Sequence, residues 1–300
     1  MLPTDFIHRF TEIAKGPDPD LAPAALFIAR LEYPHLDARQ YLDRLDEMGE
    51  NVSKRLSLLD SDPAPAEQID AISSYLFKDE GFTGNTEAYD DPRNSFLNQV
   101  IERRTGIPIT LALVYIEVAR RAGVRVDGVN FPGHFLLRLT KASPHTDDHI
   151  IIDPFHGGNV LSEMDCQKLM RKHSRENSEF DGRLLVRATK QQILLRMLVN
   201  LKTIYVRMRS FPQAFTLTEL LLALDPSAMT ELRDRGLLAY HLNYFSSALR
   251  DLETYLHFTS RSDKGRTDET LETGEVTEQE ENAEIWEHIK ELRRRVASLN

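Results

Sequence analysis

The stretch that decides the fold contains TGIPITLA at residues 105–112, FPGHF at 131–135 and IIDPF at 151–155. Residues 111–119 are apolar on almost all sides, which predicts a helix buried in the centre of its domain. Pro108 lies in the first turn of this helix, where a missing N–H costs nothing. The helix should end after a basic last turn at Gly123, a residue typical of the C′ position.

Three short strands are predicted after the helix. Their strand-forming residues lie at 124–126, 134–139 and 149–153. The polar run at 141–148 has the composition of a hairpin loop. Because the second strand begins with His134 and the third ends with Asp153, we expect both side chains to return to the first turn of the helix.

The residues before this stretch predict a helical platform. Apolar residues recur at helical spacing in four segments, at 5–14, 24–31, 37–58 and 69–77. Asp37 can cap the third segment, and breaks rich in proline and glycine separate the segments. These first 90 residues carry no pattern that points to chemistry.

A repeat with a period of 34 residues follows the stretch. The pairs that show it are Lys202 with Gly236, Phe211 with Phe245, and Ala214 with Ala248. The small residue at 214 and Pro226 fit the tetratricopeptide pattern of two antiparallel helices, and an accidental pair of helical hairpins is the alternative. Two units are fewer than the roughly three that a free-standing array needs, so we expect them to pack on another part of the chain.

The last part of the chain contains an acidic segment followed by a segment with an apolar helical stripe. Residues 267–284 contain eight acidic residues and no basic one, which predicts a mobile linker. A helical stripe then runs through Ile285, Ile289, Leu292, Val296 and Leu299. We expect a final helix that caps the last repeat, and a detachable partner-binding helix is the alternative.

Composition restricts the class of protein. The net charge of −10 argues against nucleic-acid binding, which needs a basic surface. No run approaches the roughly 18 apolar residues of a membrane span, and the first residues lack the features of a signal peptide. The single cysteine, Cys166, excludes a disulfide framework within the chain and a Cys-rich zinc site. These features predict a cytoplasmic protein that binds neither nucleic acid nor membrane.

Six short pieces carry a resemblance to a known family. They are NSFLN at 94–98, RTGIPI at 104–109, NFPGHF at 130–135, DPF at 153–155, RMLVNLK at 196–202 and RDRG at 233–236. The core resembles the transglutaminase-like superfamily, which is related to papain-like cysteine proteases. The whole chain, over roughly residues 20 to 260, resembles SirB-type bacterial proteins, which join such a domain to tetratricopeptide repeats. The resemblance implies a protein of regulatory or unknown role, because these proteins have no firmly assigned reaction.

The resemblance also locates a triad and shows that one member is missing. In active transglutaminase-like enzymes a Cys opens the buried helix about fifteen residues before the closing glycine, and counting back from Gly123 gives Pro108. A helix N-terminus and a neighbouring imidazolium lower the pKa of a thiol there. Pro108 has no nucleophilic atom, whereas His134 and Asp153 match the superfamily's histidine and aspartate.

No other residue is a good candidate for the missing nucleophile. Cys166 follows the core, so the triad order would be wrong, and we expect it to be a structural thiol. Thr110 points to a different side of the helix from Pro108. Ser95 would have to come from the preceding helix.

Two interpretations of His134 and Asp153 therefore stay open. In the first, they are a residual pair that holds two strands together or helps to bind a partner. In the second, they are an acid–base dyad that works with an unusual nucleophile such as water. We expect the pocket around them to be lined by Asn94, Pro108, Thr110, Pro132, Gly133, His134 and Asp153.

A metal centre is a further alternative for this region. The candidate ligands are His134, His149, Asp153 and His156, but their spacing matches no standard zinc pattern. We therefore expect no metal and no cofactor.

The sequence predicts an α+β protein with four parts. Residues 1–182 form a transglutaminase-like domain with its helical N-terminal platform, and residues 183–262 form all-α tetratricopeptide-like hairpins. Residues 263–284 form the acidic linker and residues 285–300 the capping helix.

The predicted function is a non-catalytic regulatory or interaction protein with a protein or peptide partner. The alternative is a peptidase-like or amidase-like hydrolase that acts through His134 and Asp153. The sequence identifies neither the partner-binding residues nor the oligomeric state.

Overall fold

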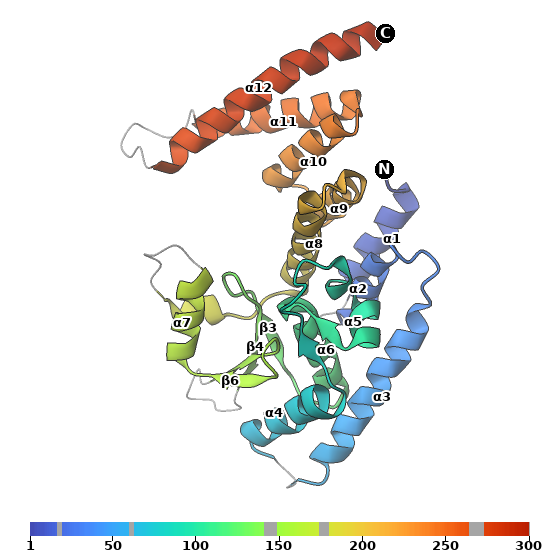
Figure 1. Ribbon diagram of the computed structural model, residues 1–300, viewed down its shortest axis with the longest axis vertical. Coiled ribbons are helices and arrows are strands. Elements are labelled where there is room, and N and C mark those ends of the chain that lie inside the picture. The colour runs from blue at the N-terminus through green and yellow to red at the C-terminus, as the bar shows by residue number, and fades with distance from the viewer. Residues whose placement is uncertain (17–19, 60–62, 141–148, 174–179, 264–272, 300) are drawn as a thin grey trace. The chain divides into compact units, whose positions relative to one another are not determined.

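Helix α6 (Pro108–Arg121) is buried over most of its length in the computed structural model, which describes residues 1–300 except 17–19, 60–62, 141–148, 174–179, 264–272 and 300 (Figure 1). Every residue from Pro108 to Ala119 is buried, as the apolar pattern predicts. Gly123 has a φ of 82°, and the N–H of Val124 donates to the carbonyl of Ala119 at 2.9 Å. This is the glycine-terminated helix end expected there.

The chain divides into two compact units. One is Arg9–Asn200, and the other is Met1–His8 together with Leu201–Asn300. The division falls inside two helices, α1 (Thr4–Ala14) and α8 (Lys190–Arg207). The domain boundary that the sequence places at 182/183 stays a prediction.

The predicted platform helices are present. They are α1 (Thr4–Ala14), α2 (Ala22–Ala29), α3 (Ala38–Leu56), α4 (Pro65–Ser73) and the π-helical η1 (Ser74–Asp79). The 3-10 helix η2 (Pro92–Asn94) and α5 (Leu97–Arg103) follow before the central helix. The carboxylate of Asp37 accepts from the N–H of Arg39 at 3.0 Å, which confirms the predicted cap of α3. Helix α3 packs on α6 at Gly49, where a Cβ would collide with the side chain of Arg121. The absence of a side chain at Gly49 therefore lets the platform lie directly on the central helix.

An antiparallel sheet follows α6 in the order β3-β4-β5-β6. Its strands are β3 (Asp127–Val129), β4 (Leu136–Thr140), β5 (His149–Asp153) and β6 (Asn159–Leu161). The strand predicted at 149–153 is confirmed, whereas the strand predicted at 124–126 is wrong, because Val124 closes α6 and pairing starts at Asp127. Strand β6 was not predicted, and the hairpin loop expected at 141–148 lies outside the described residues.

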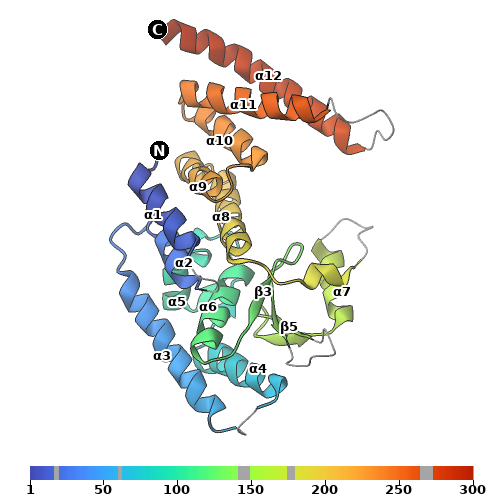
Figure 2. The same ribbon diagram turned by 180° about the vertical axis from the view of Figure 1, so that it is seen from behind.

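Helix α7 (Glu163–His173) lies beside the sheet (Figure 2). The hydroxyl of Ser162 accepts from the N–H of Asp165 at 3.2 Å and so caps the start of this helix. Cys166 is fully buried on α7 in a core cluster that continues to the short 3-10 helix η3 (Gly182–Leu185). The other buried members of that cluster are Val129, Phe131, Leu136, Ile151, Met170 and Leu185.

Helical hairpins form the second unit, as the 34-residue period predicts. After α8 come α9 (Phe211–Leu224), α10 (Met229–His241) and α11 (Phe245–Asp263), so α9 and α11 begin at equivalent phenylalanines. Ala214 and Ala248 are fully buried. The ammonium of Lys202 donates to Glu231 at 2.7 Å and to Asp234 at 2.6 Å, which joins α8 to α10.

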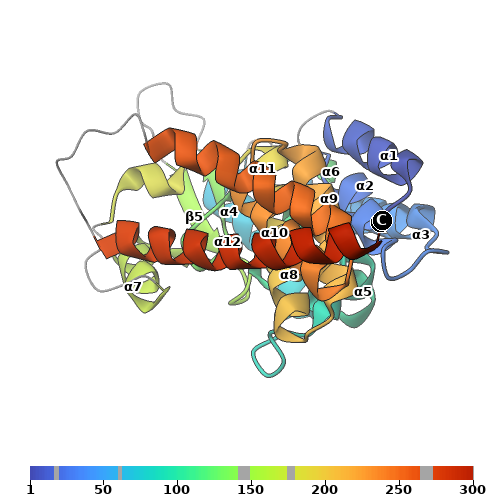
Figure 3. The ribbon, with the colours of Figure 1, turned by 90° about the horizontal axis from the view of Figure 1, so that it is seen from above.

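The last helix, α12 (Thr273–Leu299), runs beside α11 (Figure 3). Ile285, Ile289 and Leu292 are buried, so the predicted capping stripe is confirmed for these residues. The helix nevertheless begins at Thr273 rather than at 285, so the prediction that residues 273–284 form a linker is wrong. Glutamate is a good helix former, and an acidic composition does not prevent a helix. Within the described part of the chain, no helix is both long and apolar enough to cross a membrane.

Candidate functional site

A tight turn positions His134 just before β4. Gly133 has a φ of 66°, which favours glycine, and the N–H of His134 donates to the carbonyl of Phe131 at 3.1 Å. Pro132 presets the turn before the glycine. Pro132 and Gly133 therefore set the direction in which the chain enters β4.

A second turn positions Asp153, the last residue of β5. Its Oδ1 accepts from the N–H of Phe155 at 2.9 Å and from the N–H of His156 at 3.3 Å. Gly157 and Gly158 then adopt left-handed φ values of 73° and 74°, and the N–H of Gly158 donates to the carbonyl of Asp153 at 2.9 Å. This turn fixes the carboxylate through backbone atoms and folds His156 back over it.

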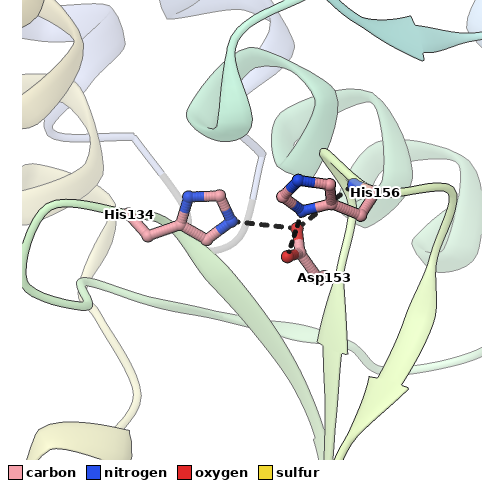
Figure 4. A group of neighbouring side chains, drawn as sticks. All are labelled: His134, Asp153 and His156. Atoms are coloured by element: carbon pink, nitrogen blue, oxygen red, sulfur yellow. Dashed lines mark hydrogen bonds and ion pairs between the residues drawn. The ribbon is translucent and has the colours of Figure 1, made fainter. Parts of the chain in front are cut away.

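The two turns bring three side chains together (Figure 4). Nε2 of His134 lies 2.9 Å from Oδ1 of Asp153, and both side chains are buried. Nδ1 of His156 lies 2.7 Å from Oδ2 of the same carboxylate, although 53% of the His156 side chain is exposed. The two imidazole rings stack, with centroids 5.9 Å apart. One buried carboxylate is therefore shared by a buried and a half-exposed histidine.

The histidines also control the charge of the carboxylate. Burial alone would raise the pKa of Asp153, but hydrogen bonds and positive charge from His134 and His156 outweigh burial and lower that pKa below its ordinary value. Asp153 is therefore ionised at neutral pH and acts only as an acceptor.

Phe155 connects this cluster to the start of α6. Its ring contacts the His134 ring edge to face, with centroids 6.0 Å apart. It also packs so closely on Gly84 that a Cβ there would lie 2.6 Å from the ring. Gly84, in β1 (Thr83–Gly84), pairs with Gly106 of β2 (Thr105–Gly106), two residues before Pro108. That the Pro108 ring faces His134 stays a prediction.

Two of the predicted pocket residues have structural hydrogen bonds. The hydroxyl of Thr110 donates to the carbonyl of Asn94 at 2.7 Å and accepts from the N–H of Ile107 at 3.2 Å. The side-chain amide of Asn94 donates to the carbonyls of Ala88 and Tyr89 at 2.7 and 3.2 Å. Asn94 and Thr110 therefore hold the preceding loop against the first turn of α6. Their role in binding stays a prediction.

The alternative nucleophiles are not activated. Burial and, to a smaller extent, the nearby acids Asp165, Glu163 and Asp153 raise the pKa of the Cys166 thiol to about 11, so Cys166 stays a thiol at neutral pH. The hydroxyl of Ser95 is buried, and no base among the described residues lies within hydrogen-bond reach of it.

Sequence reasoning left His156 out of the site and placed it only in a four-residue metal group. The structure brings His134, Asp153 and His156 together, with their ligand atoms within 4.8 Å of one another, and this group does not contain His149. The missed signal was the turn chemistry of Asp153 to Gly158, because an Asp followed by a tight turn directs the next side chains back over its carboxylate.

Comparison with known proteins agrees with the two units. Residues 39–199 match the Transglutaminase-like superfamily, and residues 201–292 match the Tetratricopeptide repeat family. A "UPF0162 protein" of Xylella fastidiosa is 40% identical over 239 residues, which are 79% of this chain and 83% of the relative. A "UPF0162 protein" of Vibrio cholerae is 29% identical over 189 residues, which are 63% and 68% of the two chains. "F-box only protein 21" of Mus musculus is 34% identical over 182 residues, which are 58% of this chain but 28% of the relative.

Proposed function

Because this chain belongs to the transglutaminase-like superfamily, we propose that its core is a degenerate enzyme pocket in a non-catalytic regulatory or protein-interaction protein. The observation that carries this proposal is the loss of the thiol. Covalent catalysis needs a nucleophile beside an imidazole. Proline stands at position 108, and the chain's single cysteine is buried on α7 with a raised pKa.

The tetratricopeptide segment supports a protein or peptide as the partner. Its paired helices form a compact unit of their own, and such repeats present extended surfaces to partners. The net charge of −10 disfavours a nucleic acid as the partner. A cytoplasmic location belongs to the same proposal and is supported by the single cysteine.

A hydrolase that uses water is the second candidate. The 2.9 Å contact between His134 and the ionised Asp153 favours it, because a carboxylate that orients an imidazole is the arrangement of a general base. His134 would then activate a water molecule in place of a thiol.

Capture of the partner by the full-length protein distinguishes the two candidates. The retained partner should bind the purified chain reversibly, and mass spectrometry should show that its covalent mass is unchanged after incubation. A new cleavage product that forms with the wild type and with His149→Ala, but not with His134→Ala, would instead establish the hydrolase. His149 is a suitable control because it lies on β5 outside the cluster.

A further inference from the structure

Three potential metal ligands converge at the end of the sheet (Figure 4). Nε2 of His134 and Nδ1 of His156 each point at a different oxygen of Asp153, at 2.9 and 2.7 Å. The three side chains come from the approach to β4, the end of β5 and the turn after β5. They are brought together by the fold and not by a short sequence motif.

Two imidazoles and one carboxylate are a common donor set for divalent transition metals. Zinc, iron, cobalt and nickel accept it, and they leave further positions for water or another ligand. In a tetrahedral zinc site with bonds of about 2.0–2.1 Å, neighbouring ligand atoms lie ~3.3 Å apart. The three ligand atoms lie within 4.8 Å of one another, so the pair that is farthest apart has to approach by up to about 1.5 Å. Rotation of the half-exposed His156 ring can supply this movement.

The cluster is already organised for such an ion. Two backbone N–H groups, those of Phe155 and His156, hold Oδ1 of Asp153 in place without help from the histidines. His134 is set by the turn at Gly133 and by its contact with Phe155. Two ligands are thus prepositioned in a buried environment, which lowers the ordering cost of binding.

His156 provides the entry path. Its side chain is 53% exposed, whereas the other two are almost completely buried. An ion can therefore enter from the solvent side as the His156 ring rotates.

We propose that His134, Asp153 and His156 form a binding site for one divalent transition metal ion, of the class that includes Zn²⁺. This goes beyond the proposed function, because it holds whether or not the core turns over a substrate. It departs from the expectation of no metal, and of the four candidate ligands weighed from the sequence it keeps His134, Asp153 and His156 and leaves out His149.

Titration of the tag-free full-length protein with Zn²⁺ against a fluorescent chelator tests the site. We expect one equivalent to bind and the melting temperature to rise, because the ion binds only the folded chain. His156→Ala should weaken binding by on the order of 100-fold or more, since even residues that only support a ligand are worth roughly 10–100-fold. His149→Ala removes a histidine from the same strand and should leave the affinity unchanged.

Asp153→Asn and a Co²⁺ titration complete the test. Asp153→Asn should weaken binding as His156→Ala does, and the visible spectrum of the Co²⁺ form should change in both variants but not in His149→Ala. Wild-type affinity no tighter than that of His156→Ala would overturn the proposal, as would equal losses in His156→Ala and His149→Ala. Because His156 is half exposed, His156→Ala should fold, and circular dichroism verifies this.

Discussion

Pro108 is the residue at which the triad alignment can be tested directly. Pro108→Cys places a thiol in the first turn of α6. The substitution adds a backbone N–H at a position where the helix needs no hydrogen bond, so it should not disturb the helix. If His134 lies beside it, the helix N-terminus and the imidazole should lower the pKa of the new thiol below the roughly 8.5 of a free cysteine. The thiol should then react with iodoacetamide faster than Cys166 at mildly acidic to neutral pH.

His134→Ala in the Pro108→Cys background is the matched control. It should remove most of the rate advantage, because one of the two positive neighbours is lost. A thiol at 108 that reacts like an ordinary cysteine while His134 is present would show that the triad alignment is wrong. Membership of the superfamily would then rest on fold and sequence similarity alone.

Cys166 should be almost unreactive in the native protein. With a pKa of about 11 and a fully buried side chain, its thiolate is scarce at pH 8. Mass spectrometry should show slow alkylation that becomes fast in urea. Cys166→Ser should lower the free energy of unfolding by about 1–3 kcal/mol, since it buries a hydroxyl in an apolar cluster. Rapid native labelling, or a Ser variant as stable as the wild type, would contradict the packing of α7.

At the scale of elements, Glu117 joins two helices. Its carboxylate is fully buried on α6 and accepts from the N–H of Leu21 at 2.7 Å and of Ala22 at 3.3 Å, at the start of α2. It also pairs with Arg120 at 3.0 Å and with Arg121. The carboxylate thus caps one helix with a side chain from another.

Glu117→Ala should therefore destabilise the protein strongly. We expect a loss of about 3 kcal/mol in the free energy of unfolding by urea, because the buried N–H groups at the start of α2 lose their acceptor and Arg121 keeps only its ion pair with Asp46. Glu47→Ala removes an exposed carboxylate that pairs with Arg44 on the surface of α3, and it should cost less than about 1 kcal/mol. Similar losses in the two variants would show that Glu117 is not a buried helix cap.

Local sequence predicts the bounds of some helices and strands better than those of others. The period of α6 and the caps at Asp37 and Ser162 are local signals, and the structure follows them. The strand expected at 124–126 does not form, because the N–H of Val124 donates to the carbonyl of Ala119 at the end of α6 and is not available for strand pairing. Helix α12 starts earlier than its apolar stripe indicates, because the glutamates that precede Ile285 are good helix formers.

At the scale of the whole molecule, the stability of the helical hairpins should depend on α12, which packs beside α11. A fragment of residues 183–262 lacks α12, whose buried Ile285, Ile289 and Leu292 would be missing from the second unit. Two repeat units without this cover expose apolar surface, so the fragment should aggregate or melt without cooperativity. Calorimetry of a fragment of residues 183–300 should show a sharper transition. A cooperative transition of the 183–262 fragment at the temperature of the intact chain would refute the prediction.

The buried helix and the 34-residue repeat can be predicted from the sequence, because periodicity and caps are local properties. The pairing of His134 with Asp153 was implied by the resemblance to the transglutaminase-like superfamily, and the structure contains it. Which other side chains meet depends on tertiary packing. His156 reaches Asp153 through a turn of two left-handed glycines, and Glu117 reaches α2 across 96 residues of sequence. Such contacts depend on backbone angles and on the packing of distant elements, and the order of residues along the chain does not encode them directly.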